Sequence, residues 1–500
     1  MKKDIKIALV NPRIESYSSM ISPMGLLWIA AVLEKNGFCV RIFDIYPRDD
    51  RDIRRLIAYA PDVVGMTVLT DYWDRAKYIA EMIQKNLTDF VFVVGGVHVT
   101  VLPEESLIGL NAEVGVVGEG ERTMLELCRS LSDGADWRGI SGIVFRDTFG
   151  RVVYNTPREY IKNLDELPLP ARHLLSFEDY LTPPGIIRGH WSERSTTVMT
   201  SRGCPFDCIW CGSMCTFGKK VRYRSVESVL DEIELLVRDY SIDSVWFCDD
   251  TFTLDKFRVL EFCDKLLNRK INVRWGCQAH VTTADEDMFK AMKKAGLCQL
   301  DFGVESGSNR VLKMLKKNSD NIAIKRAFNI ARKIGIRTMA TFMFGCPGEE
   351  KEDVKSTFAL ANEIAPNFVS SFFLTPYPGT ELMKMAEENN WITANERKTH
   401  GLKKGPMLEI NFRAEELLDI RRKFQKAFIF RNFSSIILNP FYLFKMISLL
   451  FRYPYGLLIG IRVFMKTFVF DDLVFGFLDY YIEKKTVGGK TIRDANGITI

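Results

Sequence analysis

The sequence predicts an α/β protein with two parallel sheets and a helical C-terminal extension. The first sheet is expected to be Rossmann-like and doubly wound, and the second to be a partial (β/α)6 barrel of the TIM type. Short apolar runs alternate with helix-length amphipathic patterns over most of the first 390 residues, which is typical of parallel strands joined by helices. Polar or glycine-rich clusters follow nearly every predicted strand, where parallel sheets bind their ligands.

Composition narrows the class of protein. The chain has 500 residues, 47% of them hydrophobic, enough for packed cores in about two to four domains. Its 68 basic and 63 acidic residues leave a net charge of +5, too small a bias to indicate a nucleic-acid partner. The 11 cysteines are scattered apart from one loop, the usage of a reducing, cytoplasmic compartment.

The N-terminus and the rest of the chain show no membrane-spanning pattern. The apolar run Ile5–Val10 is short and ends at Asn11-Pro12, so it is expected to be a first strand and not a signal peptide. No window reaches the ~18 uncharged apolar residues of a spanning helix.

Residues 1–135 are predicted to form the first domain. The expected strands are Ile5–Val10, Cys39–Phe43, Val63–Thr67, Phe90–Val94 and Val114–Val117. Helices are expected at Gly25–Asn36, at Asp71–Gln84 and, after Glu121, in a last helix that runs to Leu131. The candidate ligand loops at the strand ends are Asn11–Met24, Thr67–Thr70, Gly95–Thr100 and Gly118–Glu121. The G-x-G-x-x-G fingerprint of dinucleotide sites is missing after the first strand.

Residues 136–192 are predicted to be a linker, and residues 193–390 the barrel. The linker contains a hairpin, with strands at Ile140–Arg146 and Arg151–Asn155, and then a proline-rich stretch. The six expected barrel strands are Thr196–Thr200, Ser244–Cys248, Val273–Cys277, Leu300–Val304, Thr338–Phe344 and Phe368–Leu374. Six βα units fit a partial barrel better than a closed eight-stranded one.

Three cysteines lie in one short loop after the first barrel strand. Cys204, Cys208 and Cys211 have the spacing C-x3-C-x2-C, which lets one loop wrap three thiolates onto a common centre. Structural zinc usually takes four ligands in paired C-x2-C form, and Cys215 is the only spare cysteine nearby. An iron–sulfur cluster with one open iron is therefore favoured, and zinc remains the alternative.

The loop resembles the radical S-adenosylmethionine (SAM) superfamily, through its cysteine spacing and through the aromatic Trp210 before the last cysteine. The resemblance implies that the three cysteines hold a [4Fe–4S] cluster and that SAM chelates the fourth iron. One electron, from a donor such as flavodoxin or ferredoxin, would then cleave SAM to a 5′-deoxyadenosyl radical. Trp210 would lie beside the adenine.

The same resemblance suggests SAM ligands at later strand ends. Glu305 matches the position of the family's ribose-binding acid, with Ser306 beside it, and Gly345 lies in the glycine motif next to adenine. Asp249 and Asp250 stand where the family usually has a Gly-Gly-Glu stretch near the ammonium of SAM. The alternative for Asp250 and Glu305 is ordinary capping of the helices that follow.

The first domain resembles the cobalamin-binding domain that precedes many radical SAM domains. The residues assigned to cobalamin by this resemblance are Pro23, Gly25, Thr67, Gly95, Gly96, His98, Gly118 and Glu119. The D-x-H-x-x-G motif, whose histidine ligates cobalt, is missing, so cobalamin is expected to lack a histidine lower ligand. The alternative is a degenerate Rossmann-like domain without a cofactor.

Residues 391–500 are expected to be a helical extension. Between residues 420 and 470 there is no Asp or Glu, while basic and aromatic residues are frequent. Such a segment is typical of helices in a membrane interface, which would place the protein at the inner face of a membrane. Two alternatives stay open: the helices cap the barrel, or they shape a pocket for a lipid or terpenoid.

The sequence therefore predicts a cobalamin-dependent radical SAM enzyme acting on a small molecule. Methylation of an unactivated carbon in a hydrophobic substrate is the leading reaction. A radical oxidative cyclase, or another enzyme that forms C–C or C–O bonds, is the alternative within the family. A non-catalytic iron–sulfur protein is the alternative from another class. No residue is predicted to act on the substrate itself.

Overall fold

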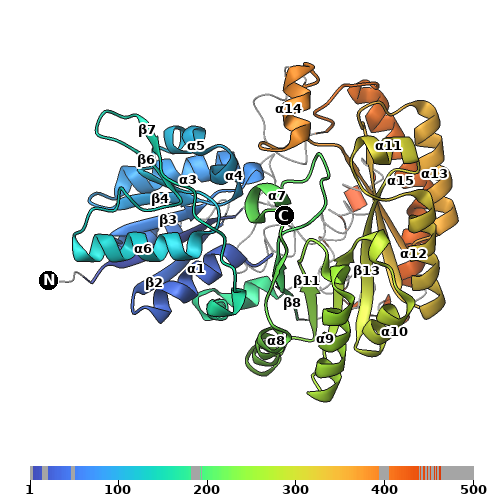
Figure 1. The fold of residues 1–500 in the computed structure, drawn as a ribbon, viewed down its shortest axis with the longest axis horizontal. Coiled ribbons are helices and arrows are strands. Elements are labelled where there is room, and N and C mark those ends of the chain that lie inside the picture. The colour runs from blue at the N-terminus through green and yellow to red at the C-terminus, as the bar shows by residue number, and fades with distance from the viewer. Residues whose placement is uncertain are drawn as a thin grey trace.

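The computed structural model describes residues 4–13, 21–46, 51–181, 192, 194–392 and 405–437, together with separate positions between 440 and 465. The chain forms two α/β units side by side, the N-terminal one in blue and the barrel in green to orange (Figure 1). In the described part of the chain, no helix combines the length and the apolar character that a membrane span requires. The predicted fold class is confirmed.

The N-terminal sheet has seven strands in the order β2-β1-β3-β4-β5-β6-β7. Its parallel strands are β1 (Lys6–Pro12), β2 (Cys39–Ile45), β3 (Val63–Thr67), β4 (Val91–Gly95) and β5 (Val114–Val116). The hairpin expected in the linker, β6 (Ile143–Arg146) and β7 (Val152–Tyr154), extends this sheet as antiparallel strands. Isolated hairpins are only marginally stable, and joining the sheet gives this one a buried face.

Helices cover both faces of this sheet, as doubly wound sheets require. They are α1 (Met24–Lys35), α2 (Arg51–Tyr59), α3 (Trp73–Asn86), α4 (Val97–Val101), α5 (Pro103–Gly109) and α6 (Gly120–Asp133). Two separate apolar clusters, one on each face, form the core. The sequence did not predict α2, α4 or α5. The last two are short, and α4 overlaps the loop Gly95–Thr100 that was expected to bind a ligand.

The barrel is an open, all-parallel sheet of six strands in the order β15-β14-β13-β12-β11-β8. The strands are β8 (Ser195–Val198), β11 (Ser244–Phe247), β12 (Arg274–Ala279), β13 (Leu297–Glu305), β14 (Arg337–Phe344) and β15 (Phe368–Phe373). The accompanying helices are α8 (Val226–Tyr240), α9 (Lys256–Asn268), α10 (Glu286–Lys294), α11 (Asn309–Met314), α12 (Asn321–Ile334), α13 (Lys351–Ile364) and α14 (Glu381–Glu388).

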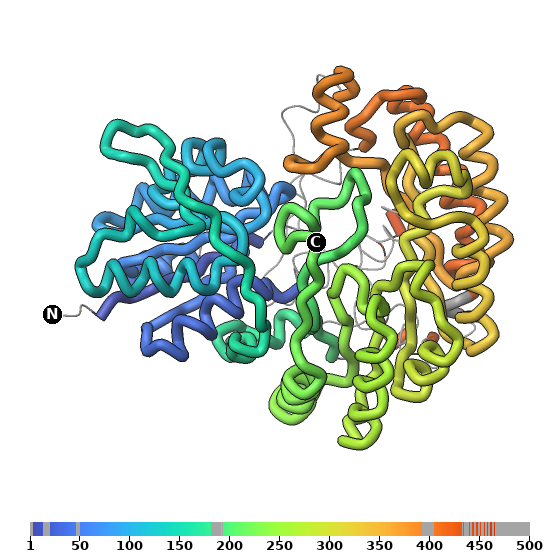
Figure 2. Tube along the Cα trace, in the orientation of Figure 1, coloured from blue at the N-terminus to red at the C-terminus, as the bar shows by residue number. Residues whose placement is uncertain are grey.

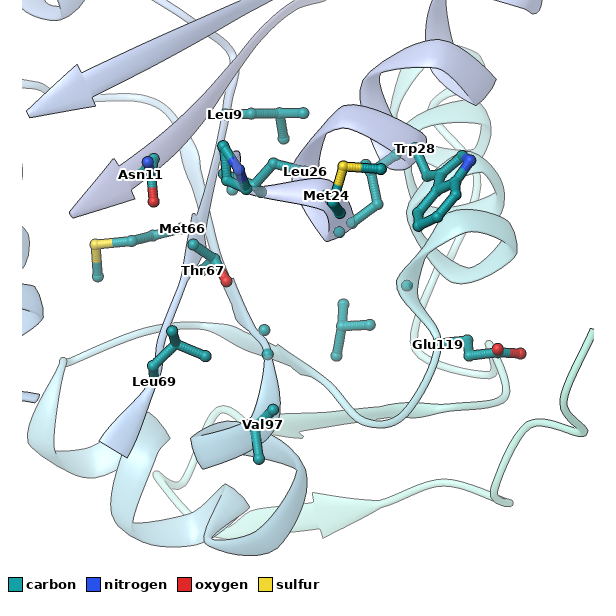
Figure 3. Close-up of a pocket in the computed structure, with 18 of the residues that line it drawn as sticks. Leu9, Asn11, Met24, Leu26, Trp28, Met66, Thr67, Leu69, Val97 and Glu119 are labelled. Carbon is teal, nitrogen blue, oxygen red and sulfur yellow. The ribbon is translucent and has the colours of Figure 1, made fainter. Parts of the chain in front are cut away.

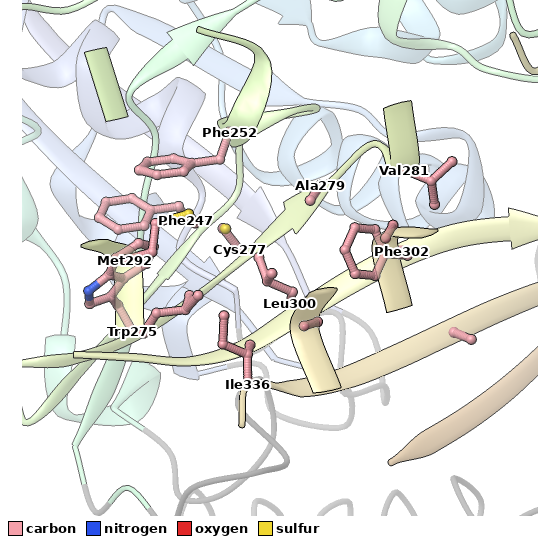
Figure 4. Packing of buried hydrophobic residues seen from close by; sticks show 14 of the residues in the cluster. Phe247, Phe252, Trp275, Cys277, Ala279, Val281, Met292, Leu300, Phe302 and Ile336 are labelled. Carbon is pink, nitrogen blue, oxygen red and sulfur yellow. The ribbon is translucent and has the colours of Figure 1, made fainter. Parts of the chain in front are cut away.

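Aromatic side chains fill the space between these strands and helices. Phe247, Phe252 and Trp275 (Figure 4) pack with Phe262, and the ring centroids of these four residues lie 4.6–5.8 Å apart. Edge-to-face packing of this kind adds to the free energy gained by burial. The core therefore fixes the strand ends on which the candidate site residues lie.

Between the two units lies a short antiparallel ribbon with the cysteine loop. The ribbon is formed by β9 (Ser201–Arg202) and β10 (Arg222–Tyr223), and α7 (Ser213–Phe217) lies between them in sequence. Figure 2 shows this green segment running along the junction of the two units. The cysteines are thus placed where both units can contribute to one site.

The helix α15 (Ala414–Ile437) covers the open edge of the barrel at β15. Phe424 and Phe428 are buried in the barrel core. The Asn432 amide donates to the Val369 carbonyl and accepts from the Val369 N–H, at 3.0 and 2.9 Å. These two bonds pair the main-chain carbonyl and N–H of Val369 on the edge strand β15, as a neighbouring strand would. Of the alternatives for the extension, barrel capping therefore describes residues 414–437.

Candidate cofactor sites

A cavity of about 440 Å³ opens at the carboxyl ends of β1, β3, β4 and β5 (Figure 3). Apolar side chains such as Leu26, Trp28 and Leu69 form much of its wall. The predicted residues on its lining are Pro23, Gly25, Thr67, Gly95, Gly96, Gly118 and Glu119. The radical-domain side also contributes, with Met199, Arg202, Thr216 and Phe217. The cavity therefore lies between the two units and belongs to both.

Glycines keep this cavity open. A Cβ added at Gly25 or Gly118 would meet no atom within 4 Å, so a side chain at either position would project into free space. Gly96 has φ +102°, and a Cβ there would lie 2.8 Å from the Val68 carbonyl oxygen. Only glycine adopts such a conformation without strain. The lining can therefore bring backbone close to a large, flat ligand.

His98 does not line the cavity. It lies in α4, fully buried, with its Nδ1 3.1 Å from the Thr70 hydroxyl and its ring 4.6 Å from that of Trp73. Among the described residues that do line the cavity there is no histidine and no cysteine. The structure thus gives His98 a packing position behind the wall.

The cysteine loop is held by main-chain bonds from three directions. Cys204 N–H donates to the Gly218 carbonyl at 3.3 Å, and Ile209 N–H donates to the Leu315 carbonyl at 3.2 Å. Leu382 N–H donates back to the Ile209 carbonyl at 2.8 Å. These bonds tie the loop to α7, to the end of α11 and to the start of α14, and so fix its position relative to both the ribbon and the barrel.

A ring stack supports the same loop from the barrel. Phe206, between the first two cysteines, stacks on His280 with centroids 4.0 Å apart. The His280 Nε2 lies 3.1 Å from the Lys317 carbonyl oxygen. Burial, together with the nearby charge of Lys317, lowers the pKa of His280 to about 4. His280 is therefore neutral at pH 7.

The three thiols share one partly buried environment. Burial raises the pKa of Cys204, Cys208 and Cys211, that of Cys208 to about 12, while the Lys317 ammonium opposes the rise at each thiol. In the described part of the chain, no three His, Cys, Asp or Glu side chains surround a single ion. A four-iron cluster instead takes each thiolate on a different iron, so its ligands stand farther apart.

A buried ion pair lies next to the thiols. The Lys317 ammonium is 2.9 Å from Glu305 Oε1 and 5.6 Å from the centre of the Trp210 ring. Glu305 has φ +66°, and a Cβ at Gly303 would lie 2.3 Å from its Oε1. A non-glycine residue in this region costs about 1–3 kcal/mol and is typical of functional sites. Glycine at position 303 makes room for the pair.

The two adjacent aspartates have different partners. Asp249 is buried and accepts four hydrogen bonds from the amides and hydroxyls of Thr200 and Ser201, at 2.5–3.0 Å. It thereby fixes the turn that leads into the cysteine loop. Asp250 accepts from the Ser213 hydroxyl at 2.5 Å, and its charge helps to raise the pKa of Cys204 and Cys211. Asp250 is thus the aspartate beside the thiols.

Ser306 and Gly345 make bonds within the protein. The fully buried Ser306 hydroxyl accepts from Ser308 N–H at 3.1 Å. Gly345, with φ +85°, donates its N–H to Glu349 Oε2 at 2.7 Å. Burial raises the pKa of Glu349 to about 7.

Comparison with known proteins identifies both units. A model of the radical SAM superfamily matches residues 198–361, and a model of the B12 binding domain matches residues 11–128. An uncharacterised methyltransferase of Pyrococcus horikoshii is 35% identical over 441 residues, covering 86% of this chain and 93% of the relative. The chain belongs to the radical SAM superfamily. It carries a B12 binding domain in front of the radical SAM domain.

Two further similarities extend the comparison. The anaerobic magnesium-protoporphyrin IX monomethyl ester cyclase of Rubrivivax gelatinosus is 29% identical over 394 residues, covering 76% of this chain and 70% of the relative. The structure of TsrM, a radical SAM methyltransferase from Kitasatospora setae with cobalamin and a [4Fe–4S] cluster bound, superposes with a TM-score of 0.65. That match has 22% identity and covers 78% of this chain and 76% of TsrM, so it supports the fold.

The cofactors of this radical SAM enzyme are a [4Fe–4S] cluster, SAM and cobalamin. The donor sets fit these groups. Three neighbouring thiols suit an iron–sulfur cluster with one open position. The cation of Lys317 and the carboxylate of Glu305 lie beside them, where a ligand with a carboxylate and ribose hydroxyls can bind both. The glycine-bordered cavity leaves room for a flat macrocycle.

Sequence reasoning did not identify three residues that the structure brings to these sites. Lys317 and His280 lie next to the cysteine loop, and Arg202 lines the N-terminal cavity. In the sequence Lys317 is one of two adjacent lysines, and nothing next to it predicts that it is buried. The one signal is Gly303, because a side chain there would collide with the ion pair of Lys317 and Glu305. Arg202 comes two residues before Cys204, in the run Ser-Arg-Gly-Cys, where nothing local distinguishes it from a surface arginine.

Proposed function

We propose that the protein methylates an unactivated carbon of a hydrophobic small molecule. The cavity between the B12 binding domain and the cysteine loop carries this proposal, because both units line it. When bound, the cluster with SAM supplies a radical that removes a hydrogen atom, and cobalamin supplies the methyl group. The chain itself binds and orients these groups and keeps water away from them.

The proposed ligand roles follow from side-chain chemistry. Cys204, Cys208 and Cys211 would hold the cluster. Glu305 would accept from the ribose hydroxyls of SAM and Lys317 would pair with its carboxylate, while Asp250 would face its ammonium and Trp210 its adenine. Gly345 would border the adenine through its main chain. Asp249 and Ser306 would act indirectly, because their described bonds go to the protein.

The cobalamin ligands are proposed from the cavity lining. Pro23, Gly25, Thr67, Gly95, Gly96 and Gly118 would contact the corrin. His98 is proposed to support the wall of the cavity and not to ligate cobalt, because it is buried away from the lining. Glu119 lines the cavity as well, but its carboxylate is engaged elsewhere.

A radical oxidative cyclase is the second candidate, favoured by the 29% identity to the Rubrivivax cyclase. Labelled SAM separates the two. The reconstituted enzyme, reduced flavodoxin and methyl-deuterated SAM are incubated with a lipid extract from a deletion strain, and products are followed by mass spectrometry. A product that gains the labelled methyl group supports methyl transfer. A product that loses two hydrogens and gains no label overturns it in favour of the cyclase. Cys208→Ala serves as the inactive control.

We also propose peripheral contact with the inner face of a membrane. The described helical positions beyond α15 expose large apolar side chains three or four residues apart: Phe444, Ile447, Phe451, Tyr455, Leu458, Ile461 and Met465. A spacing of three or four residues places neighbouring members of this set on the same side of a helix. The absence of Asp and Glu between 420 and 470 suits an anionic lipid surface. Such a location would also favour a lipid or terpenoid substrate.

Flotation with vesicles tests this contact. The full chain is expected to float with vesicles containing phosphatidylglycerol, and much less with pure phosphatidylcholine. Phe451→Glu with Leu458→Glu should abolish flotation. Phe257→Glu, at an 82% exposed position on α9, should leave it unchanged. Equal flotation of all three proteins would contradict the proposal.

A further inference from the structure

The ribbon that precedes the cysteine loop carries an unusual pair of buried arginines. Arg202 of β9 and Arg222 of β10 are register partners, and both are less than 10% exposed. Like charges opposite each other destabilise a strand pair, and a buried charge needs a partner. The ribbon therefore depends on carboxylates from outside it.

Those carboxylates come from the B12 binding domain. Arg202 lies 2.8 Å from Glu119 and 2.5 Å from Glu121, and Arg222 lies 2.8 Å from Glu119. Glu119 also accepts from the Ile161 N–H at 2.7 Å. Burial opposes the charge of Arg202, but Glu121 and Glu119 outweigh it and raise the pKa of Arg202. The charges on the two domains compensate each other only when the domains are docked.

Arg202 also lines the N-terminal cavity and lies two residues before the first cysteine of the loop. Its guanidinium lies 4.7 Å from the Trp28 ring centre and 5.5 Å from that of Phe217, and all three residues line the cobalamin cavity. Only Gly203 separates Arg202 from Cys204. Gly203 has φ +97°, and a Cβ at this position would lie 2.7 Å from the Lys220 carbonyl oxygen. This tight connection gives the side chain little freedom to move independently of the loop.

We propose that Arg202 is a positioning residue that aligns the cysteine loop with the cobalamin cavity. Its ion pairs to Glu119 and Glu121 set how far the cluster stands from the cobalt. Glu119 accordingly stabilises the interface between the two domains and does not bind the corrin. The proposal rests on the proposed function, since it requires cobalamin in the N-terminal cavity.

Arg202→Met in the full chain tests the proposal, with Arg202→Lys as the conservative variant. The matched control is Arg224→Met, because Arg224 is equally buried but pairs with Glu232 of its own domain. Three properties are measured: iron per chain, hydroxocobalamin affinity by visible absorption, and the magnetic interaction between the reduced cluster and Co(II) by electron paramagnetic resonance. None of them requires the substrate.

Arg202→Met is expected to keep its iron, to bind cobalamin about tenfold more weakly, and to show an altered cluster–cobalt interaction. Arg202→Lys should fall between it and the wild type. Arg224→Met should bind cobalamin within about twofold of the wild type. Unchanged affinity and an unchanged magnetic interaction in Arg202→Met would overturn the proposal.

A second variant covers misfolding of the first. Arg202→Met with Glu121→Gln removes the pair together and leaves the contact between Glu119 and Arg222 in place. The same two changes, weaker cobalamin binding with retained iron, are expected. If this variant binds cobalamin like the wild type, or also loses its iron, the alignment role is wrong. If the wild type itself binds no cobalamin, the proposed function fails instead, which is a separate result.

Discussion

The two parallel sheets of this chain use the carboxyl ends of their strands in opposite ways. At the N-terminal sheet, glycines and apolar side chains leave a cavity. At the barrel, the strand ends are filled with thiols and with charged groups such as Glu305 and Lys317 that pair with each other. A large flat cofactor needs space, whereas a cluster and a charged cofactor need ligands and compensated charges. The strand ends of two parallel sheets therefore support two chemistries through the side chains that they carry.

The largest expected effect is the loss of the cluster when a proposed ligand is removed. Cys208→Ala should lose most of its iron and all SAM cleavage, because two thiolates cannot retain a cluster that needs three from the protein. Iron and sulfide are counted per chain, and 5′-deoxyadenosine is measured. Cys215→Ala is the control, because its thiol donates to the Gly379 carbonyl. Full iron in Cys208→Ala would remove the ligand assignment.

The second effect places pH sensitivity in the barrel. The pKa of His280 is lowered to about 4, so its stabilising contribution is complete above about pH 6.5 and is lost as the pH falls to 4. The pKa of Glu349 is raised to about 7, so its contribution is complete below about pH 4.5 and is lost as the pH rises to 7. Each contribution amounts to about 3 kcal/mol.

Urea unfolding between pH 4 and 7 separates these two contributions. Relative to the wild type, His280→Gln should become more stable as the pH falls, and Glu349→Gln should become more stable as the pH rises. If the free energy of unfolding changed with pH in the same way for all three proteins, neither group would titrate as described. The barrel would then lack the pH sensitivity that these two residues are expected to give it.

The third effect tests whether the N-terminal sheet provides space. Gly25→Leu should weaken cobalamin binding roughly a hundredfold, because the added side chain enters the cavity. Leucine also favours the helix α1, so stability should not fall. Gly139→Leu is the control, at a position that is also open but outside the cavity. Equal cobalamin affinity, followed by visible absorption, would place the cofactor elsewhere.

The smallest effect tests the charged partners at the barrel. Glu305→Gln should weaken SAM binding about tenfold, since it replaces one oxygen of the proposed ribose acceptor by an amide donor and leaves Lys317 without its carboxylate. The adjacent lysine offers a matched control: Lys316 pairs with Glu381 on the surface, so Glu381→Gln should change little. SAM affinity is measured by equilibrium dialysis. Equal affinity in both variants would show that Glu305 has a structural role and does not bind SAM.

Local patterns predicted much of this protein. The strand–helix alternation and the cysteine spacing were readable because each is set by residues close in sequence. The hairpin at 143–154 was expected in the linker, but it pairs with β5, and strand partners are not encoded locally. Asp249 was expected at the SAM site, and its bonds to Thr200 and Ser201 depend on two strand ends meeting.

The sequence by itself determined the two parallel sheets, the cysteine loop and the ring of polar groups at the barrel's strand ends, because periodicity and spacing act within one element or one loop. Only the tertiary structure decided which charges compensate each other. Lys317 meets Glu305, and Arg202 of one domain meets Glu119 and Glu121 of the other. A buried charge is stable only beside its partner, and the chain brings such partners together only when both domains have folded.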